Sequence, residues 1–294
     1  MKQSNLLQAY HYAQAVRPIK GQTARWGLIL INGQEAGLVQ MLEAKTAFGL
    51  FHGVILDRGP LWFDGFGGAA HVKIFFEKLN QTYPQRWGRK RRILPELQQS
   101  TAFDGIIAQC GFEKKEEAGT YQTLWWNLRM SDELARDALK KNWLGSLKKA
   151  EKADLKIEWG RRGEYFDWIK EHYTLDKLER GYSGISPKFL ANLASFSTQD
   201  NPMIIGKATL NGRAIAGVLF FTHGQSATYQ VGWSSEDGRK TCAHHLLLWR
   251  ARDILKAKGI KDLDLGGIND EAKGLSQFKK GTGAQVIILA GHYF

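Results

Sequence analysis

The sequence carries one short pattern twice, once near its beginning and once in its last third. Residues 27–33 read Gly-Leu-Ile-Leu-Ile-Asn-Gly, residues 206–212 read Gly-Lys-Ala-Thr-Leu-Asn-Gly, and each is followed by a second apolar run. Asn-Gly between two strand-like runs is a strong signal for a β-hairpin, because both turn residues must accept a positive φ. Two hairpins of the same design predict a duplicated unit.

The same series of elements follows each predicted hairpin. A further strand comes at 53–56 in the first half and at 227–233 in the second, and a glycine-containing loop leads from it to a helix. Apolar residues at helical spacing mark the buried faces of these helices: Val72, Phe75, Phe76 and Leu79 in the first half, and Leu247, Leu248, Ala251, Ile254 and Leu255 in the second. We therefore predict an α/β (α+β) chain of two tandem units, each a mixed, mainly antiparallel sheet flanked by helices.

The second half begins with a helical segment of its own. Ser131 is a suitable N-cap, and Asp132 and Glu133 lie where the helix dipole favours acidic residues. The apolar spacing continues to Ala150, so one helix is expected there, followed by an alternating strand at 155–159. The predicted units are accordingly 1–129 and 130–294.

Composition limits the classes of function. The formal net charge of +12 and the pI near 9.6 favour polyanionic partners, which include nucleic acid, a phosphorylated donor and an anionic membrane face. The two cysteines, Cys110 and Cys242, have no partner at metal-ligand spacing, so neither a disulfide framework nor a metal site is predicted. We expect a cytoplasmic protein without a signal peptide or transmembrane segment, for which peripheral contact with a membrane stays open.

Four segments, in order along the chain, resemble the FemAB-type peptidyltransferases, which are built from two tandem acyltransferase units of the GNAT superfamily. They are Asp57-Arg-Gly-Pro-Leu-Trp62, Trp143-Leu-Gly-Ser-Leu-Lys-Lys-Ala-Glu-Lys152, Asp264-Leu-Gly-Gly267 and Phe278-Lys-Lys-Gly281. The resemblance implies two GNAT-like units, with the donor site in the second. It implies transfer of an acyl or aminoacyl group to an amine of a cell-envelope precursor, such as a lipid- or nucleotide-linked muropeptide.

Two donors remain open. The best-known members of the family use aminoacyl-tRNA, and shorter relatives resemble acetyl-CoA-dependent N-acetyltransferases that act on a small molecule or a saccharide. Neither donor would be a permanently bound cofactor. A loop made of Gly238, Arg239, Lys240 and Thr241 precedes a helix N-terminus, where free backbone N–H groups and the helix dipole favour an anion. A pyrophosphate or a tRNA phosphate would suit it, and an exposed polar loop is the alternative.

Acyl transfer to an amine requires a neutral nucleophile and stabilisation of an oxyanion, without a covalent enzyme intermediate. The candidate bases are Asp264, which precedes the double glycine, and His244, which lies on the predicted helix of the second half that also carries Leu247. Tyr229 is a candidate hydrogen-bond donor to the acyl oxygen. Each has an ordinary structural alternative: a turn-capping aspartate, a core histidine and a buried tyrosine with a structural hydrogen bond.

The resemblance adds further residues to the predicted site. It places Lys279, directly after Phe278, at the acyl-donor end of a cleft, with Lys280 as a second, more solvated lysine. It also assigns substrate binding to Arg58 and Trp62, where a guanidinium beside a rigid Gly-Pro turn could bind a carboxylate or phosphate in a bidentate manner. Without the resemblance these cations would be interpreted as surface charges.

Two basic clusters complete the candidate features. The first, 86–92, reads Arg-Trp-Gly-Arg-Lys-Arg-Arg and interleaves an aromatic residue with cations, and the second crowds the helical segment with Lys140, Lys141, Lys148, Lys149 and Lys152. Such compositions suit phosphate contacts and base stacking, so a catalytically silent nucleic-acid-binding protein on the same scaffold is the alternative from another class.

Overall fold

The computed structural model describes residues 3–115, 120–200, 202–268 and 272–294. Internal contacts divide the chain into unit 1, Met1–Gln122 with Ile287–Phe294, and unit 2, Thr123–Val286. This division differs from the expected one after residue 129, because the C-terminal residues return to unit 1. Tyr293 is fully buried there and exchanges two backbone hydrogen bonds with Ile93, of 2.8 and 2.9 Å.

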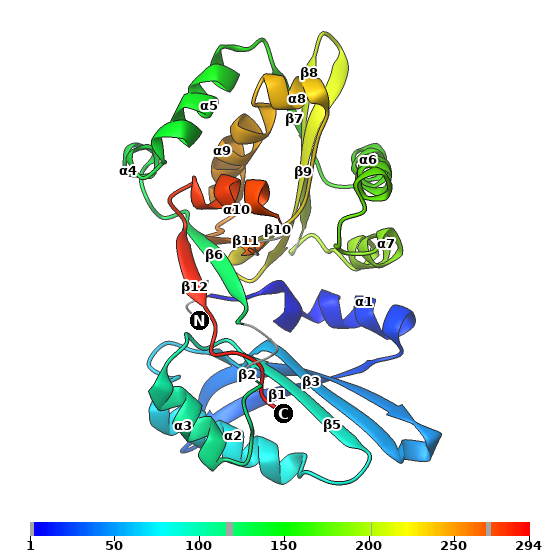
Figure 1. Cartoon of the computed structure of the whole chain (residues 1–294), viewed down its shortest axis with the longest axis vertical. Coiled ribbons are helices and arrows are strands. Elements are labelled where there is room, and N and C mark those ends of the chain that lie inside the picture. The colour runs from blue at the N-terminus through cyan, green and yellow to red at the C-terminus, as the bar shows by residue number, and fades with distance from the viewer. Residues whose placement is uncertain (1–2, 116–119, 201, 269–271) are drawn as a thin grey trace. The chain divides into compact units, whose positions relative to one another are not determined.

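Unit 1 is a sheet covered by helices on both faces (Figure 1). The sheet has the order β1-β2-β3-β5, in which β3 and β5 run parallel, and β4 pairs with β2. Its strands are β1 (Thr23–Ile31), β2 (Gln34–Thr46), β3 (Phe51–Gly59), β4 (Leu61–Trp62) and β5 (Arg89–Pro95). Its helices are α1 (Tyr10–Lys20), α2 (Ala69–Thr82) and α3 (Thr101–Gln109), with 3-10 turns at Leu6–Gln8 and Ala47–Gly49.

Unit 2 has a longer mixed sheet with the order β12-β6-β11-β10-β9-β8-β7. Its strands are β6 (Gln122–Asn127), β7 (Lys156–Gly160), β8 (Met203–Leu210), β9 (Arg213–His223), β10 (Ser226–Ser234), β11 (Asp262–Gly267) and β12 (Gln285–Ile288). Its helices are α4 (Asp132–Asp137), α5 (Lys141–Lys152), α6 (Glu164–Arg180), α7 (Pro187–Ser195), α8 (Glu236–Lys240), α9 (Ala243–Lys256) and α10 (Lys273–Lys280).

The two predicted hairpins are β1–β2 and β8–β9. Asn32 and Asn211 have φ of 50°, and the glycines that follow them have φ of 77°, as a two-residue hairpin turn with both residues left-handed requires. Each hairpin leads through an antiparallel third strand to a helix and a fourth strand that runs parallel to the third. The predicted internal repeat is therefore present in the fold.

Helices cover both faces of the unit 2 sheet (Figure 1). Consecutive residues of β9 from Ile215 onwards are buried, which is the pattern of a strand covered on both sides. On one face α5 and α9 pack through Leu147, Leu247 and Ala251 into the core. On the other face α6 packs so closely that a Cβ on Gly217 would overlap Trp168 and Ile169.

The helical segment that opens the second half differs from the expected single helix. Ser131 caps α4 by accepting a hydrogen bond from the Leu134 backbone N–H, as predicted. The chain then breaks at Lys140, which has extended dihedral angles, and α5 begins at Lys141. The backbone N–H of Lys140 instead donates to the Gly281 carbonyl at 2.9 Å, so this break ties the start of α5 to the end of α10. Within the described residues, no helix has the length and apolar character needed to cross a bilayer.

Candidate active site

The central parallel pair of unit 2 separates partway along its length. Strands β10 and β11 are in register only from Ser226 with Asp262 to Thr228 with Asp264, although β10 continues to Ser234 and β11 to Gly267. The equivalent pair in unit 1, β3 and β5, stays in register along nearly all of β5. Unpaired strand edges can bind an extended ligand through backbone hydrogen bonds. We call this opening the fork.

Backbone irregularities lie on both sides of the fork. The register of β10 with β9 shifts between Tyr229 and Val231, and that of β11 with β6 shifts between Asp264 and Gly267. Such bulges bend a strand and redirect its side chains, and they are frequent beside active sites. The separation of β10 from β11 is therefore built into both strands.

Lys279 of α10 places a buried cation beside the fork. Its side chain is only 5% exposed, and its Nζ donates to the Gly267 carbonyl oxygen at 2.8 Å. Burial lowers the pKa of this ammonium to about 8, and the charge of Asp264 partly opposes that shift. An amine with such a pKa gives up its proton more readily than an ordinary lysine.

Asp264 holds the end of β11 in place. Its Oδ1 accepts hydrogen bonds from the Thr123 hydroxyl at 2.6 Å and from the Gly266 N–H at 2.8 Å, and the residue is 1% exposed. These bonds connect β6 to the turn at Gly266, which has a φ of 78°. The geometry gives Asp264 a positioning part beside Lys279, and its role as a base stays a prediction.

Tyr229 and His244 meet across the same region. The Tyr229 hydroxyl lies 2.8 Å from Nε2 of His244. Burial lowers the pKa of His244 to about 4 and raises that of Tyr229, so both groups are neutral at pH 7. A backbone hydrogen bond to Trp233 engages the imidazole as well. Nε2 of His244 is therefore assigned as the acceptor of the hydrogen bond that the Tyr229 hydroxyl donates.

Gly232 leaves the space that this pair occupies. A Cβ at Gly232 would overlap the Tyr229 hydroxyl and approach Cε1 of His244 to 2.7 Å. The position requires glycine because side-chain atoms pass directly over the backbone.

A cavity of about 480 Å³ opens beside the pair. Tyr229, Gly232 and Trp233 of β10 line it from the sheet, and Cys242 and His244 line it at the start of α9. Ring contacts close its other side, since Phe278 of α10 lies 5.3 Å from His244 between ring centroids. The cavity thus joins the predicted catalytic tyrosine and histidine to the first turn of a helix.

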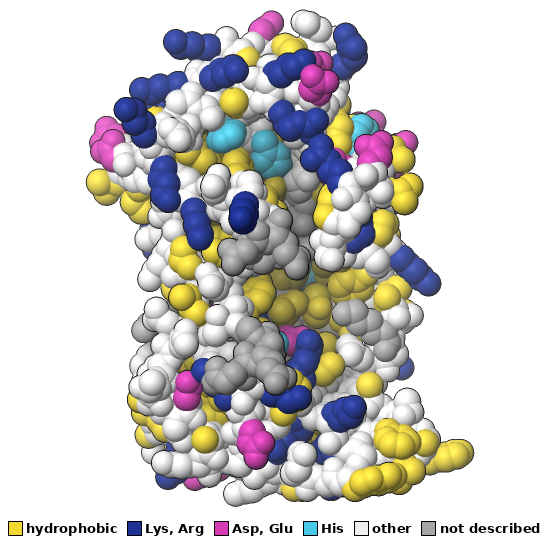
Figure 2. Space-filling model, in the orientation of Figure 1, with side chains coloured by type: hydrophobic (Ala, Val, Ile, Leu, Met, Phe, Trp, Pro, Cys, Tyr) yellow, Lys and Arg dark blue, Asp and Glu magenta, His cyan; other side chains and the backbone are white. Residues whose placement is uncertain are grey.

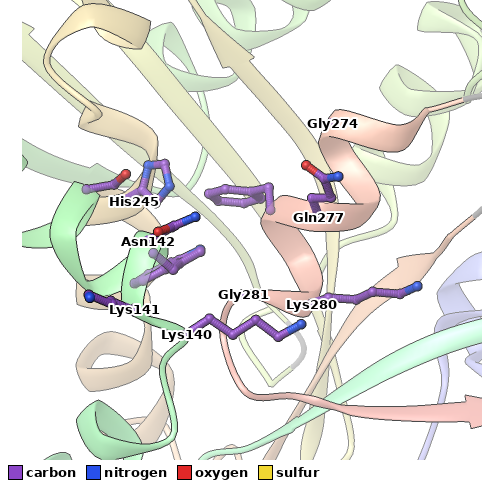
Figure 3. A pocket seen from close by; sticks show the side chains of 11 residues that line it. Lys140, Lys141, Asn142, His245, Gly274, Gln277, Lys280 and Gly281 are labelled. Carbon is purple, nitrogen blue, oxygen red and sulfur yellow. The ribbon is translucent and has the colours of Figure 1, made fainter.

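A second cavity, of about 760 Å³, continues from the first and shares His245, Gly274 and Phe278 with it. Figure 3 shows it between the start of α5, which carries Lys140 and Asn142, and α10, which carries Gln277 and Lys280. Three lysines line it: Lys140, Lys141 and Lys280. Part of the second basic cluster and the second lysine of the Phe-Lys-Lys motif therefore converge.

The start of α5 adds hydrogen-bond donors to the second cavity. Its N-cap residue, Lys140, supplies no side-chain cap, so the first-turn N–H groups remain available to an anion. Trp143 lines the same cavity and is 4% exposed, and in the described structure its buried Nε1 has no hydrogen-bond partner. The described residues that line this cavity include no Asp or Glu, and such a set of donors and cations suits a phosphate-bearing ligand.

The predicted anion-binding loop is a short helix instead. Gly238 is buried in α8, where a Cβ would overlap the Ile215 carbonyl oxygen. Arg239 donates to the Ser234 carbonyl at 2.6 Å, Lys240 pairs with Glu236 at 2.8 Å, and the Thr241 hydroxyl donates to the Asp237 carbonyl at 2.8 Å. Gly238 and Arg239 still line the first cavity, so their contact with a donor stays a prediction.

Arg58 and Trp62, the two residues of unit 1 predicted to bind substrate, both contact other side chains of their own unit. Arg58 is 3% exposed and pairs in a bidentate manner with Glu96, at 2.7 and 2.8 Å. Its guanidinium thus has the predicted geometry, but towards a carboxylate of its own unit. Trp62 packs against Phe75 at a centroid distance of 6.2 Å, and a Cβ on Gly67 would overlap its ring.

Sequence reasoning did not select His245, although it lines both cavities. Its ring makes edge-to-face contacts with Phe278 and Trp143, at centroid distances of 4.9 and 5.0 Å, and burial lowers its pKa to about 4. The adjacent pair His244-His245 at the start of a helix was the available signal. Among the described residues, no group of three or more His, Cys, Asp or Glu could hold a metal ion.

Residues 139–280 match the family model described as an acetyltransferase (GNAT) domain. That segment contains β10, α9 and α10, which line the first cavity, and α5, which lines the second together with α10. The comparison with curated proteins finds no match.

Solved structures share the fold. The chain is similar to the crystal structure of FemX, with 14% identity, a TM-score of 0.83, and coverage of 99% of this chain and 92% of that chain. A tandem GNAT protein from the clavulanic acid biosynthesis pathway has 10% identity and a TM-score of 0.53, with coverage of 93% and 83%.

A third similar structure is the C-terminal domain of a putative lysylphosphatidylglycerol synthetase from Agrobacterium fabrum, with 12% identity, a TM-score of 0.53 and coverage of 97% and 86%. These likenesses confirm the predicted fold class, a tandem arrangement of GNAT-like units with mixed sheets flanked by helices.

Proposed function

We propose that this chain, whose residues 139–280 match a GNAT acetyltransferase domain and whose fold is that of tandem GNAT-like proteins, transfers an aminoacyl group from an aminoacyl-tRNA to an amine of a cell-envelope precursor. One observation carries the proposal: the buried Lys279 stands where β10 and β11 separate, beside two connected cavities, one at the start of α9 and the other lined by lysines at the start of α5. The acceptor class, a lipid- or nucleotide-linked muropeptide, rests on the family resemblance.

The second cavity supports a donor that carries several phosphates. Lys140, Lys141 and Lys280 give its walls three positive charges, and the first turn of α5 adds backbone donors. The volume of about 760 Å³ suits a terminal nucleotide rather than a lone phosphate. The acyl ester of the same donor would then extend through the first cavity to the fork.

The reaction needs few protein groups. A neutral amine attacks the ester carbonyl carbon, a C–N bond forms and the C–O bond to the ribose breaks, while the amine loses one proton and the ribose oxygen gains one. The Lys279 ammonium would stabilise the negative charge on oxygen and give its proton to the ribose oxygen, and the resulting neutral Lys279 amine would take up the proton that the attacking amine loses. Because its pKa is about 8, it is mostly charged at pH 7 and is a stronger acid than a free lysine.

Tyr229 would position the acyl group. Its hydroxyl proton is directed to His244, so its oxygen lone pairs remain available to an N–H or ammonium group of the aminoacyl moiety. This differs from the predicted donation to the acyl oxygen, because the hydroxyl donates its hydrogen bond to the neutral imidazole of His244.

Acetyl-CoA is the second candidate donor. The family model that matches this segment is an acetyltransferase domain, and the start of α9 beside the first cavity could bind a pyrophosphate. With acetyl-CoA as donor, the unpaired strand edges at the fork would form hydrogen bonds with the amide groups of the pantetheine arm. The acceptor would then be a small molecule or a saccharide.

Parallel assays with one purified sample separate the two donors. The protein is incubated with a UDP-linked muropeptide and either charged tRNA or labelled acetyl-CoA, and products are identified by mass spectrometry. We expect an aminoacylated muropeptide with charged tRNA. Acetylated product alone would establish the second candidate, whereas tight tRNA binding with no product from either donor would favour the silent nucleic-acid-binding protein.

A further inference from the structure

Four large apolar side chains gather on the surface of unit 1 and form what we call the aromatic tip. Phe48 is fully exposed, and Leu50 and Phe51 are about half exposed, in the connection between β2 and β3. Trp87, which precedes β5, is 73% exposed, and its ring lies 5.7 Å from that of Phe51. Single exposed apolar residues are ordinary, but contiguous clusters mark interaction surfaces.

The backbone directs this cluster outwards. Ala47 and Phe48 both have positive φ, of 47° and 55°, a conformation that residues with a side chain rarely adopt. The loop with Trp87 packs directly on this turn: a Cβ on Gly88 would overlap the Leu50 carbonyl oxygen. Arg86 joins the two segments by donating to the Gly49 carbonyl at 3.3 Å and the Trp87 carbonyl at 3.0 Å.

Positive charge surrounds the aromatic tip. The segments 44–53 and 82–92 contain no Asp or Glu, and the cations nearest the tip are Lys45, Arg86, Arg89 and Lys90. Lys45 lies 3.7 Å from the buried Glu43. Further along β5 come Arg91 and Arg92, of which Arg92 pairs with Asp57. Most of these are exposed or partly exposed, and Arg91 is buried. Figure 2 shows hydrophobic side chains gathered at the lower right of the view, where Figure 1 places the connection between β2 and β3.

A shallow cavity of about 500 Å³ lies beside the Phe51–Trp87 pair. Arg89 and Lys90 line it together with both rings. This arrangement places an apolar wall next to two cations, as the headgroup region of an anionic lipid requires.

We propose that the aromatic tip inserts into the interface of an anionic bilayer while the surrounding lysines and arginines contact lipid phosphates. The positive charge around the tip favours an anionic partner. The chemistry of the outermost residues favours a bilayer over single-stranded nucleic acid. Leu50 offers no flat face for a base, whereas a leucine and a phenylalanine at a protruding turn both gain by leaving water for the acyl boundary. The surface lies in unit 1 and does not depend on the proposed acyl transfer.

Vesicle flotation tests the surface directly. Wild-type protein is mixed with vesicles of phosphatidylcholine alone or of phosphatidylcholine with phosphatidylglycerol. We expect binding to the anionic vesicles that weakens with salt, and a loss of about tenfold or more for the combined variant Phe48→Ser with Leu50→Ser. Lys45→Gln and Lys90→Gln are each expected to weaken binding about fivefold.

Two controls keep the result specific. Leu178→Ser removes a side chain that is 79% exposed on α6 and should leave flotation unchanged, and Phe48→Trp should retain it. Thermal unfolding of each variant shows whether the fold is intact.

Three results would overturn the proposal. The first is equal binding of the wild type to neutral and anionic vesicles. The second is flotation of the Phe48→Ser, Leu50→Ser variant at the wild-type level. The third is a wild-type protein that does not float, together with a variant that loses binding to single-stranded RNA or loses self-association in light scattering.

Discussion

The hydrogen bond between the Tyr229 hydroxyl and Nε2 of His244, 2.8 Å long, connects β10 to the first turn of α9 at the point where β10 leaves β11. Both side chains are largely buried and neutral, because burial raises the pKa of the tyrosine and lowers that of the histidine to about 4. The pair therefore fixes the shape of the fork without adding charge to it.

Tyr229→Phe should reduce turnover about tenfold while lowering the free energy of unfolding by only about 1 kcal/mol, since it leaves Nε2 of His244 buried without its donor. His244→Gln should act in the same direction. A double-mutant cycle on both turnover and urea unfolding measures the coupling, which we expect to be about 1 kcal/mol. Strictly additive effects would show that the two residues act independently.

Gly232→Ala should abolish this pairing, because the added methyl group would occupy the position of the Tyr229 hydroxyl. We expect a loss of activity at least as large as that of Tyr229→Phe and a cost of about 1–3 kcal/mol in stability from overpacking. Gly145→Ala is the matched control, since a Cβ there meets nothing within 4 Å inside α5. That control should be stabilised by about 0.5–1 kcal/mol. Normal activity in Gly232→Ala would contradict the proposed positioning by Tyr229.

The duplicated scaffold was predictable because its signals are local. Each Asn-Gly turn depends on two adjacent residues with positive φ, and each helix shows its buried face in its own sequence. The return of the chain end to unit 1 was not predictable in this way. It depends on the burial of Tyr293 against Ile93, two residues separated by most of the chain.

Local sequence signals also selected some of the residues that the fold brings together at the candidate site. Tyr229 and His244 were each selected from local context, but only the fold shows that they bond each other. The segment at Gly238 was interpreted as a phosphate loop because a glycine with two cations precedes a helix, whereas that glycine is required by close packing on the Ile215 backbone. Lys140 and Lys280 line the same cavity because the helix is interrupted at Lys140, before α5 begins. No local sequence pattern indicated that interruption.

Lys279 and Lys280 are adjacent but should differ in kinetic effect. Lys279→Ala removes the buried cation beside the fork and should lower kcat about 100-fold, the scale of losing one oxyanion contact. Lys280→Ala removes a charge from the wall of the second cavity and should raise KM for the donor several-fold with little change in kcat. Steady-state kinetics with either donor distinguishes the two. An unchanged kcat in a folded Lys279→Ala protein would exclude Lys279 from the chemical step.

Lys279 should also make stability depend on pH in a defined window. Its pKa is about 8 in the folded protein against 10.5 in the unfolded chain, so between these values the unfolded state holds one more proton. The free energy of unfolding therefore rises with pH from 8 to 10.5, by about 3 kcal/mol for this residue, and the folded state bears the full cost of the buried charge below pH 8.

Urea unfolding of the wild type and of Lys279→Met at pH 7.5 and pH 10.5 isolates that contribution, since other titrations are common to both proteins. We expect the wild type to gain stability relative to the variant as pH rises, and parallel pH profiles would show that the lysine is not buried as a cation. Activity should change in the opposite direction. If the ammonium stabilises the oxyanion, kcat falls above pH 8 in the wild type, whereas Lys279→Arg, which stays charged, should lose that fall and keep a lower but flatter profile.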